Sequence, residues 1–165
     1  MCSELAHPMN EPRRKWWARP RKLCALERPG GGGRSHRPER RRDDIKWLKA
    51  SGVHTVISTM RTKHNLTAYE NAGLRWIHVP VGETEDAVEE LEQLLVILRR
   101  ELRRAGAVAI HGHRHSDFVA AVCAAYLDDT YDIPVEEGLE RAAEAGLTIT
   151  PEAAALVGAE LSLAS

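Results

Sequence analysis

Cysteine and long apolar runs are both scarce in this sequence of 165 residues. Its three cysteines, Cys2, Cys24 and Cys123, are odd in number and widely scattered, which argues against a disulfide framework or a cysteine-based zinc site. No apolar run approaches the length of a membrane span, and the sequence shows no charged start, apolar core and cleavage site of a secretory signal. We therefore expect a cytoplasmic protein that has no contact with a membrane.

Aromatic residues are also few, at 5% of the chain, and the longest glycine run lacks a phosphate-binding ending. The run Gly30–Gly33 is not followed by the Gly-Lys-Ser/Thr of a nucleotide P-loop, so we interpret residues 28–38 as a flexible connector. What is present is ordinary: 43% apolar and 28% charged residues, in a chain long enough for one hydrophobic core.

The net charge of −1 conceals an uneven distribution. Residues 1–61 hold 15 Lys and Arg against 6 Asp and Glu, whereas the remainder holds 8 against 18. A basic head on an acidic body is typical of a nucleic-acid or acidic-partner contact, but also of a solvated segment that folds back on its own acidic surface. Few stacking aromatics accompany the basic residues, which favours the second interpretation.

Short apolar segments alternate with helical patterns, which predicts an α/β fold with a small, mainly parallel sheet of about four strands between helices. We expect strands at 23–26, 53–58, 75–79 and 107–110, and helices at 38–50, 66–72, 85–105, 135–145 and 151–161, with a further apolar helix ending at 127. The apolar stripe of the longest helix contains Val88, Leu91, Leu94, Leu95, Leu98 and Leu102. We expect residues 22–165 to form one domain, and residues 1–21 to form a disordered or irregular basic arm whose Trp16 and Trp17 dock on that domain.

Residues 107–127 are the stretch most suggestive of function. An apolar strand leads through the polar loop His111–Asp117 into an apolar helix, which points backbone N–H groups and a positive helix end at one place. Ligands of parallel sheets bind beyond the carboxyl ends of the strands. The sequence therefore predicts an anion site at this loop.

The order of these segments resembles the cysteine-dependent dual-specificity and tyrosine phosphatases, in particular bacterial members. The resemblance rests on DDIKWLKASGVHTVIS, RWIHVPV, VAIH and VAAVCAAYL, and covers about residues 20–160. It implies a tyrosine-phosphatase-like, three-layer fold. It also implies a signature His-Cys-x5-Arg-Ser/Thr after the last strand, in which the cysteine attacks phosphorus and the arginine binds the phosphoryl oxygens.

The signature is degenerate where the chemistry resides. His111 matches the signature histidine, but Gly112 stands in place of the cysteine and Phe118 in place of the arginine. Glycine has no nucleophile, and phenylalanine has no charge for phosphate. Asp117 adds a negative charge, and Arg114 is wrongly spaced to replace the arginine. The resemblance therefore implies a phosphatase fold without phosphatase catalysis.

The three alternate histidines leave three interpretations open, one of which is metal-free ligand binding through imidazolium charge. In an extended loop, His111, His113, His115 and Asp117 point the same way and are candidate ligands of a divalent metal, which would allow metal-assisted hydrolysis of a phosphate or other ester. Alternatively, His111 is a structural histidine that bonds loop carbonyls, and no cofactor is bound.

We predict a catalytically inactive phosphatase-like protein that acts as a binding or regulatory module for a phosphorylated ligand or a protein partner. The metal-assisted hydrolase and the nucleic-acid or acidic-partner binder remain alternatives. The predicted anion-binding residues are His111, Gly112, His113, Arg114, His115, Ser116 and Asp117.

Overall fold

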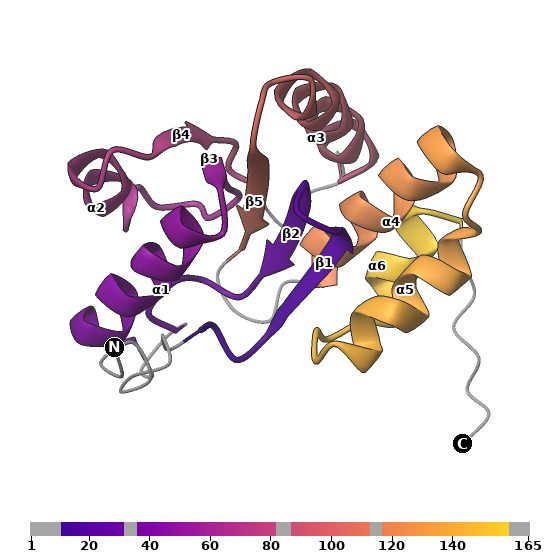
Figure 1. The fold of residues 1–165 in the computed structure, drawn as a ribbon. Helices are drawn as coiled ribbons and strands as arrows, with labels where there is room; N and C mark the ends of the chain where they lie inside the picture. Colours follow the sequence, from indigo (N-terminus) through magenta and orange to yellow (C-terminus); the bar gives the residue numbers. More distant parts are fainter. Residues whose placement is uncertain (1–10, 32–35, 82–86, 113–116, 159–165) are drawn as a thin grey trace, which may run out of the picture.

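The computed structural model describes residues 11–31, 36–81, 87–112 and 117–158. Within these ranges the strands are β1 (Lys15–Arg19), β2 (Leu23–Leu26), β3 (Val53–Ser58), β4 (Arg75–His78) and β5 (Ala107–His111). The helices are α1 (Pro38–Ala50), α2 (Leu66–Asn71), α3 (Ala87–Leu102), α4 (Asp117–Tyr131), α5 (Val135–Glu144) and α6 (Pro151–Leu156) (Figure 1). The predicted α/β architecture is confirmed.

The strands form a single five-stranded sheet in the order β1-β2-β5-β3-β4. The pairs β2–β5, β5–β3 and β3–β4 are parallel, and β1 alone runs antiparallel, beside β2. The expectation of a mainly parallel sheet holds, with one strand more than the four expected. Strand β5 lies at the centre, and all five of its residues are buried because helices cover both faces of the sheet.

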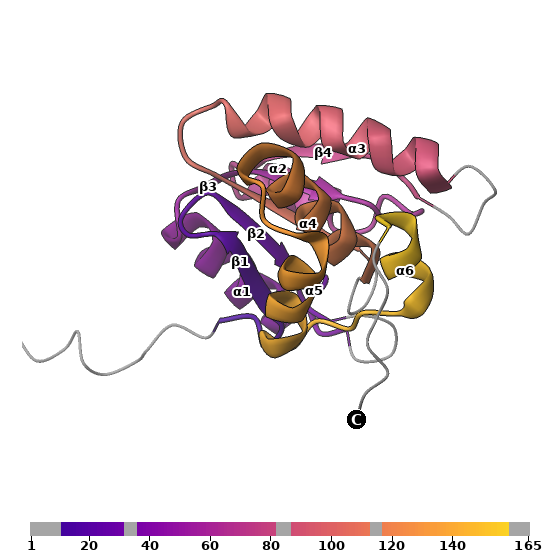
Figure 2. The same cartoon turned by 90° about the vertical axis from the view of Figure 1, so that its right-hand side faces the viewer.

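Side chains alternate between the two faces of the sheet and supply two separate cores. The hydrophobic cluster on one face combines residues of α3, α4 and α5 with the strand residues Leu23, Ala25, Val108 and Ile110. Cys24, Leu26, Ala107 and Ala109 belong to the other cluster, with residues of α1 and α2. The result is three layers, with α1 and α2 on one side of the sheet and α3 to α6 on the other (Figures 1 and 2).

The helix boundaries follow local signals in the sequence. Pro38 occupies the first turn of α1, and the hydroxyl of Thr150 accepts a hydrogen bond from the Ala153 N–H at the start of α6. The predicted apolar stripe of α3 is correct except at its beginning. Val88 is 52% exposed, whereas Leu91 and Leu94, further along the helix, are buried.

The prediction that residues 1–21 form an irregular arm is wrong for Lys15–Arg19, which forms strand β1. The strand exists because Leu23–Leu26 offers a partner across a short turn, an interaction that the period of 15–19 does not reveal. Docking of the two tryptophans is confirmed: Trp16 is buried in the core, and the Trp17 ring lies 5.8 Å from the Trp47 ring. Residues 1–10 lie outside the described residues.

The segment after β2 is a connector, as expected, but its first part is not loose. Residues 27–31 are buried, the Gly31 N–H donates to the Arg28 carbonyl, and the Arg37 N–H donates to the Gly30 carbonyl. Gly30 has a φ of +93°, which favours glycine there. In the described part of the chain, no helix is both long and apolar enough to cross a membrane.

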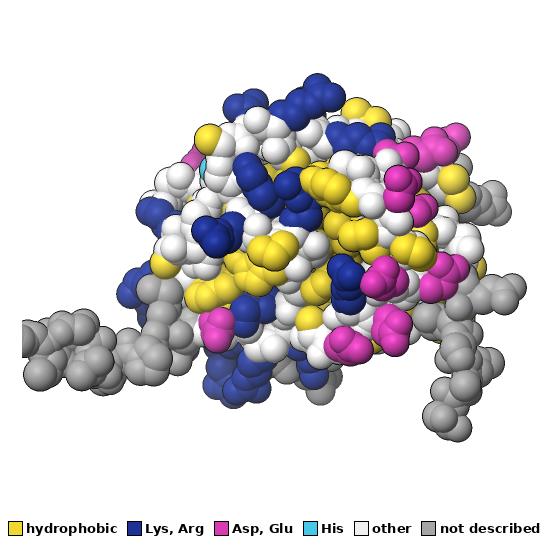
Figure 3. All heavy atoms as spheres, turned by 45° about the vertical axis from the view of Figure 1, so that its right-hand side comes forward, with side chains coloured by type: hydrophobic (Ala, Val, Ile, Leu, Met, Phe, Trp, Pro, Cys, Tyr) yellow, Lys and Arg dark blue, Asp and Glu magenta, His cyan; other side chains and the backbone are white. Residues whose placement is uncertain are grey.

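Basic and acidic side chains gather on different parts of the surface. Figure 3 shows most Asp and Glu side chains toward the right of one face, with Lys and Arg spread over its top, its left side and its lower edge. Exposed acidic residues of the carboxyl-terminal helices include Asp128, Asp129, Glu136, Glu137, Glu140, Glu144 and Glu152. Nucleic-acid or acidic-partner binding by the basic segment stays a prediction.

Candidate functional site

The carboxyl ends of three parallel strands meet beside His111. The register pairs His111 of β5 with Leu26 of β2 and with Ser58 of β3, so the loops that follow these strands emerge side by side. Thr59 anchors the end of β5, since its N–H and its hydroxyl both donate to the His111 carbonyl, at 2.9 and 3.1 Å. This edge is where ligands bind in parallel α/β sheets.

The imidazole of His111 is buried, and both of its nitrogens are hydrogen-bonded within the protein. Nδ1 lies 2.8 Å from the Gly112 carbonyl, which only accepts, so Nδ1 carries the proton and donates it. Nε2 therefore accepts from the Tyr69 hydroxyl, at 2.7 Å. Burial lowers the pKa of His111 to about 4, so the ring is neutral near pH 7.

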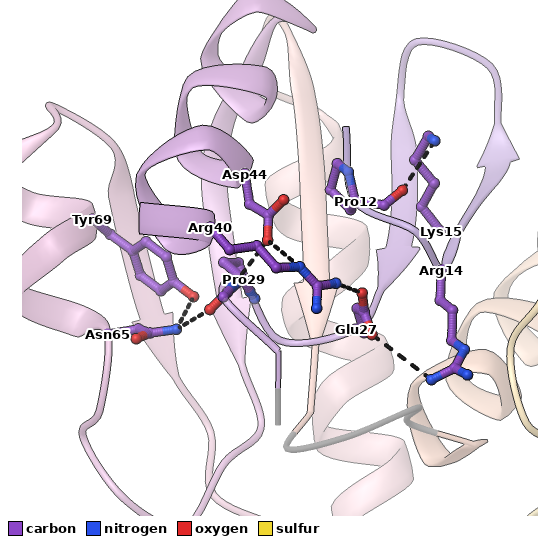
Figure 4. A network of polar contacts seen from close by, with 10 residues as sticks. Pro12, Arg14, Lys15, Glu27, Pro29, Arg40, Asp44, Asn65 and Tyr69 are labelled. Carbon is purple, nitrogen blue, oxygen red and sulfur yellow. Dashed lines mark hydrogen bonds and ion pairs between the residues drawn. The ribbon is translucent and has the colours of Figure 1, made fainter. Parts of the chain in front are cut away.

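A chain of hydrogen bonds extends from His111 to the start of α2. The Asn65 side-chain amide donates to the Tyr69 hydroxyl at 3.4 Å and to the Pro29 carbonyl at 2.9 Å (Figure 4). Arg41 Nη1 donates to Asn65 Oδ1 at 3.1 Å. Asn65 has a φ of +78°, a left-handed conformation that asparagine tolerates better than most residues. The loops after β2, β3 and β5 are thereby held together.

The predicted loop residues are described only in part. Gly112 follows β5 directly and is buried. Phe118, in the first turn of α4, is half-buried and packs against the core on the α3–α6 side. His113, Arg114, His115, Ser116 and the side chain of Asp117 lie outside the described residues. Their role in anion binding stays a prediction.

The structure bears on the metal hypothesis at His111. A histidine that donates from Nδ1 and accepts at Nε2 has no nitrogen left for a metal ion, which agrees with the alternative of a structural histidine. His78, at the same edge of the sheet, bonds the Met60 carbonyl through Nε2 at 2.7 Å. Among the described residues, no group of three or more His, Cys, Asp or Glu is placed to hold a metal. A site built on His113 and His115 remains a prediction.

Neither described cysteine is placed to act as a nucleophile. Cys24 and Cys123 are both fully buried. Burial raises the pKa of the Cys24 thiol to about 12 and that of Cys123 well above its usual range, so both stay protonated. The prediction that Cys123 lies on the buried face of its helix is confirmed.

A second polar network joins β2 to α1. Asp44 accepts the Gly30 N–H at 2.8 Å and lies 3.8 Å from Arg40 Nε (Figure 4). Glu27 pairs with Arg40 and, at 4.0 Å, with Arg14. The buried carboxylates of Glu27 and Asp44 are thus neutralised by two arginines and a backbone N–H, all from the basic head.

Sequence reasoning missed a cluster of basic side chains beyond β2. Arg28 follows β2 by two residues and is only 6% exposed, and its Nη2 is hydrogen-bonded to the ring of His64. The His36 and His64 rings lie 4.8 Å apart, in an edge-to-face arrangement. An arginine directly after an apolar strand, at the same edge as the histidine loop, is the signal that would have identified it.

No protein-family model and no curated protein matches the sequence. Solved structures do. Human DUSP28 matches with a TM-score of 0.66 and 19% identity, covering 88% of this chain and 91% of that one. A putative DUF442 phosphatase from Shewanella putrefaciens matches with a TM-score of 0.63 and 18% identity, covering 95% and 94%. Pseudomonas aeruginosa TpbA in complex with phosphotyrosine matches with a TM-score of 0.62 and 21% identity, covering 84% and 80%.

These similarities extend over most of the chain in each case. The chain therefore has the fold of the dual-specificity and tyrosine phosphatases, as the sequence resemblance implied. At this level of identity the likeness establishes the fold, and the activity has to be argued from the side chains.

Proposed function

We propose that this protein uses a phosphatase fold to bind a phosphorylated ligand and does not transfer the phosphoryl group. One observation carries the proposal: Gly112 follows His111 at the end of β5, where the resemblance places the nucleophilic cysteine. Glycine has no side chain to attack phosphorus, so a phosphoenzyme intermediate is not formed at this position.

The neighbouring residues do not compensate for this loss. Phe118, which stands in place of the phosphate-binding arginine, is apolar and packs on the core. The two described cysteines are buried and protonated, on β2 and in α4. An enzyme of this type needs both a thiolate and a positive charge for the transition state, and neither position provides one.

The features that bind an anion are better retained than those that cleave an ester. Gly112 follows β5 at the ligand edge of the sheet, and the described chain resumes in the 15-residue helix α4, whose amino end favours negative charge. The buried hydrogen bonds of His111 hold the beginning of the loop after β5. A helix amino end at the ligand edge of the sheet, without a nucleophile beside it, is suited to recognition.

The test is a turnover assay on p-nitrophenyl phosphate and a panel of phosphopeptides, with the Gly112→Ala variant as matched control. We expect wild type and variant to be equally inactive, because neither glycine nor alanine at position 112 provides a nucleophile. Turnover by wild type above that of Gly112→Ala would refute the proposal. Turnover that persists in Gly112→Ala but is lost with EDTA would replace it with the metal-assisted alternative.

Binding is measured separately, by titrating the same phosphopeptides and their unphosphorylated forms into the full chain. The proposal predicts a clear preference for the phosphorylated form. Equal affinity for both forms would contradict it, because no phosphate would then be recognised.

A further inference from the structure

We propose that Arg28, His36, His64 and Arg41 form an oxyanion centre that binds the phosphate group of the ligand. This inference deepens the proposed function and rests on it, since it names the fixed positive charge that Phe118 cannot supply. Arg28 and His36 come from the β2–α1 connection, Arg41 from α1, and His64 from the β3–α2 loop. Tertiary structure brings these three segments together at the ligand edge of the sheet.

Arg28 is a buried cation without a carboxylate partner among the described residues. Its guanidinium remains charged, because arginine does not deprotonate in proteins. Its Nη2 is bonded to the His64 ring, whereas its buried Nε has no hydrogen-bond partner in the described part of the chain. A buried charge without a counter-ion destabilises the folded protein, and a bound anion would neutralise it.

The acidic groups nearby in the chain are engaged elsewhere. Glu27 pairs with Arg40 and Arg14, and Asp44 pairs with Arg40 and accepts the Gly30 N–H. The network in Figure 4 thus satisfies these two carboxylates without Arg28. Glu27, beside Arg28 in the chain, and Asp44 of α1 are therefore both paired, whereas Arg28 has no carboxylate partner among the described residues, which favours a binding role over a structural ion pair.

His36 completes the cluster beside Arg28. Its Nε2 is buried and unpartnered among the described residues, and the ring lies so close to Gly30 that a Cβ there would come within 2.6 Å of Nε2. Burial, followed by the charges of Arg28, His64 and Arg41, lowers the pKa of His36 to about 4, although a side-chain hydrogen bond with Asn65 acts in the opposite direction. A bound oxyanion would supply the missing acceptor and reverse this repulsion.

The cluster also adjoins His111. Asn65 links Arg41 to Tyr69, and Tyr69 donates to His111. Among the causes that lower the pKa of His111 is the charge of Arg28. Arg28 is therefore close enough for its charge to act on His111 at the end of β5, beyond which the resemblance places the phosphate. The planar guanidinium of Arg28 can donate two parallel hydrogen bonds to a phosphate group, which a lysine ammonium does not do.

The experiment titrates inorganic phosphate and O-phosphotyrosine into the full chain by calorimetry, using wild type, Arg28→Gln and Arg42→Gln. Arg42 is an exposed arginine of α1, so its variant makes the same charge change outside the cluster. We expect Arg28→Gln to weaken phosphate binding roughly tenfold or more, and Arg42→Gln by less than about twofold. If wild type binds O-phosphotyrosine and Arg28→Gln does not, the natural ligand is a phosphate ester. If wild type binds inorganic phosphate but not O-phosphotyrosine, the natural ligand is the free phosphate ion.

Equal affinity in wild type and Arg28→Gln would overturn the inference while leaving the proposed function standing, because the anion would then be held elsewhere. No binding of phosphate or ester to wild type would also overturn it. Phosphatase turnover would instead refute the proposed function, and it is measured independently.

Two further measurements guard against misfolding of Arg28→Gln. Arg28→Lys keeps the positive charge but loses the paired N–H donors of the guanidinium, and should bind phosphate with an affinity between those of wild type and Arg28→Gln. In wild type, NMR titration of the imidazole signals should show saturating phosphate raising the pKa of His36 by roughly one unit or more. An unchanged pKa of His36 under these conditions would refute the centre.

Discussion

Lowering the pH from 7 to 5 should destabilise the fold through His111. The buried ring donates from Nδ1 to the Gly112 carbonyl and accepts at Nε2 from Tyr69, so a second proton would have no acceptor. Burial lowers the pKa of His111 from 6.5 to about 4 in the folded chain. In the unfolded chain the ring is in water and titrates near its ordinary value.

The magnitude follows from the protons bound in each state. Between pH 6.5 and 4 the unfolded chain carries a proton on His111 that the folded chain does not, so stability falls as the pH falls. At pH 5 the loss amounts to about 2 kcal/mol, and at pH 4 it approaches its limit of about 3 kcal/mol, at 1.36 kcal/mol per pKa unit. Above pH 7 the contribution of His111 no longer changes.

The assay is urea unfolding from pH 7.5 to 4.5 of wild type and of His111→Gln, which keeps an oxygen to accept from Tyr69. Other titrating groups, including His36 and His54, are present in both proteins, and their contributions cancel in the difference. The stability difference between wild type and variant should shrink by about 2 kcal/mol from pH 7 to 5. A difference that stays constant across this range would refute the neutral, doubly bonded His111.

Three further predictions concern the frame around the site. Trp16→Ala should lower the free energy of unfolding by about 3–5 kcal/mol, because this side chain lies in the core. Trp76→Ala should lower it clearly less, because Trp76 is 38% exposed. Equal losses would contradict the packing of β1 against the core. Glu101→Ala should lower the free energy of unfolding by about 1–3 kcal/mol, because the buried carboxylate pairs with three arginines. The matched change at the exposed Glu92 of the same helix should leave the thermal or urea midpoint almost unchanged. Asp44→Asn should cost about 1–2 kcal/mol, since Asp44 accepts the Gly30 N–H and pairs with an arginine, and an unchanged urea midpoint would show that this buried contact is dispensable.

Most of the regular structure is readable from local patterns. Strands β2 and β3 and helix α1 have the predicted bounds, because a short apolar run, a β-branched run, the Pro38 start and the Gly52 stop are signals within a few residues. Strand β1 is not readable in this way. Lys15–Arg19 is extended because Leu23–Leu26 lies beside it, and its basic residues resemble those of a solvated arm.

The candidate site divides in the same manner. That Gly112 and Phe118 stand where the resemblance places the signature cysteine and arginine is a prediction that residue identity and spacing allow. The state of His111 does not, because its partner Tyr69 is 42 residues away in sequence. Its two hydrogen bonds favour the structural interpretation over the metal ligand, two of the alternatives that the alternating histidines leave open.

The sequence by itself determined the α/β order, which depends on residue type and short-range period, and it predicts through the resemblance that the signature nucleophile is missing. Only the tertiary structure decided that β1 joins the sheet, that His111 is neutral and that Arg28, His36, Arg41 and His64 converge. Convergence and protonation depend on burial and on partners from distant segments, and a linear pattern holds no information on either.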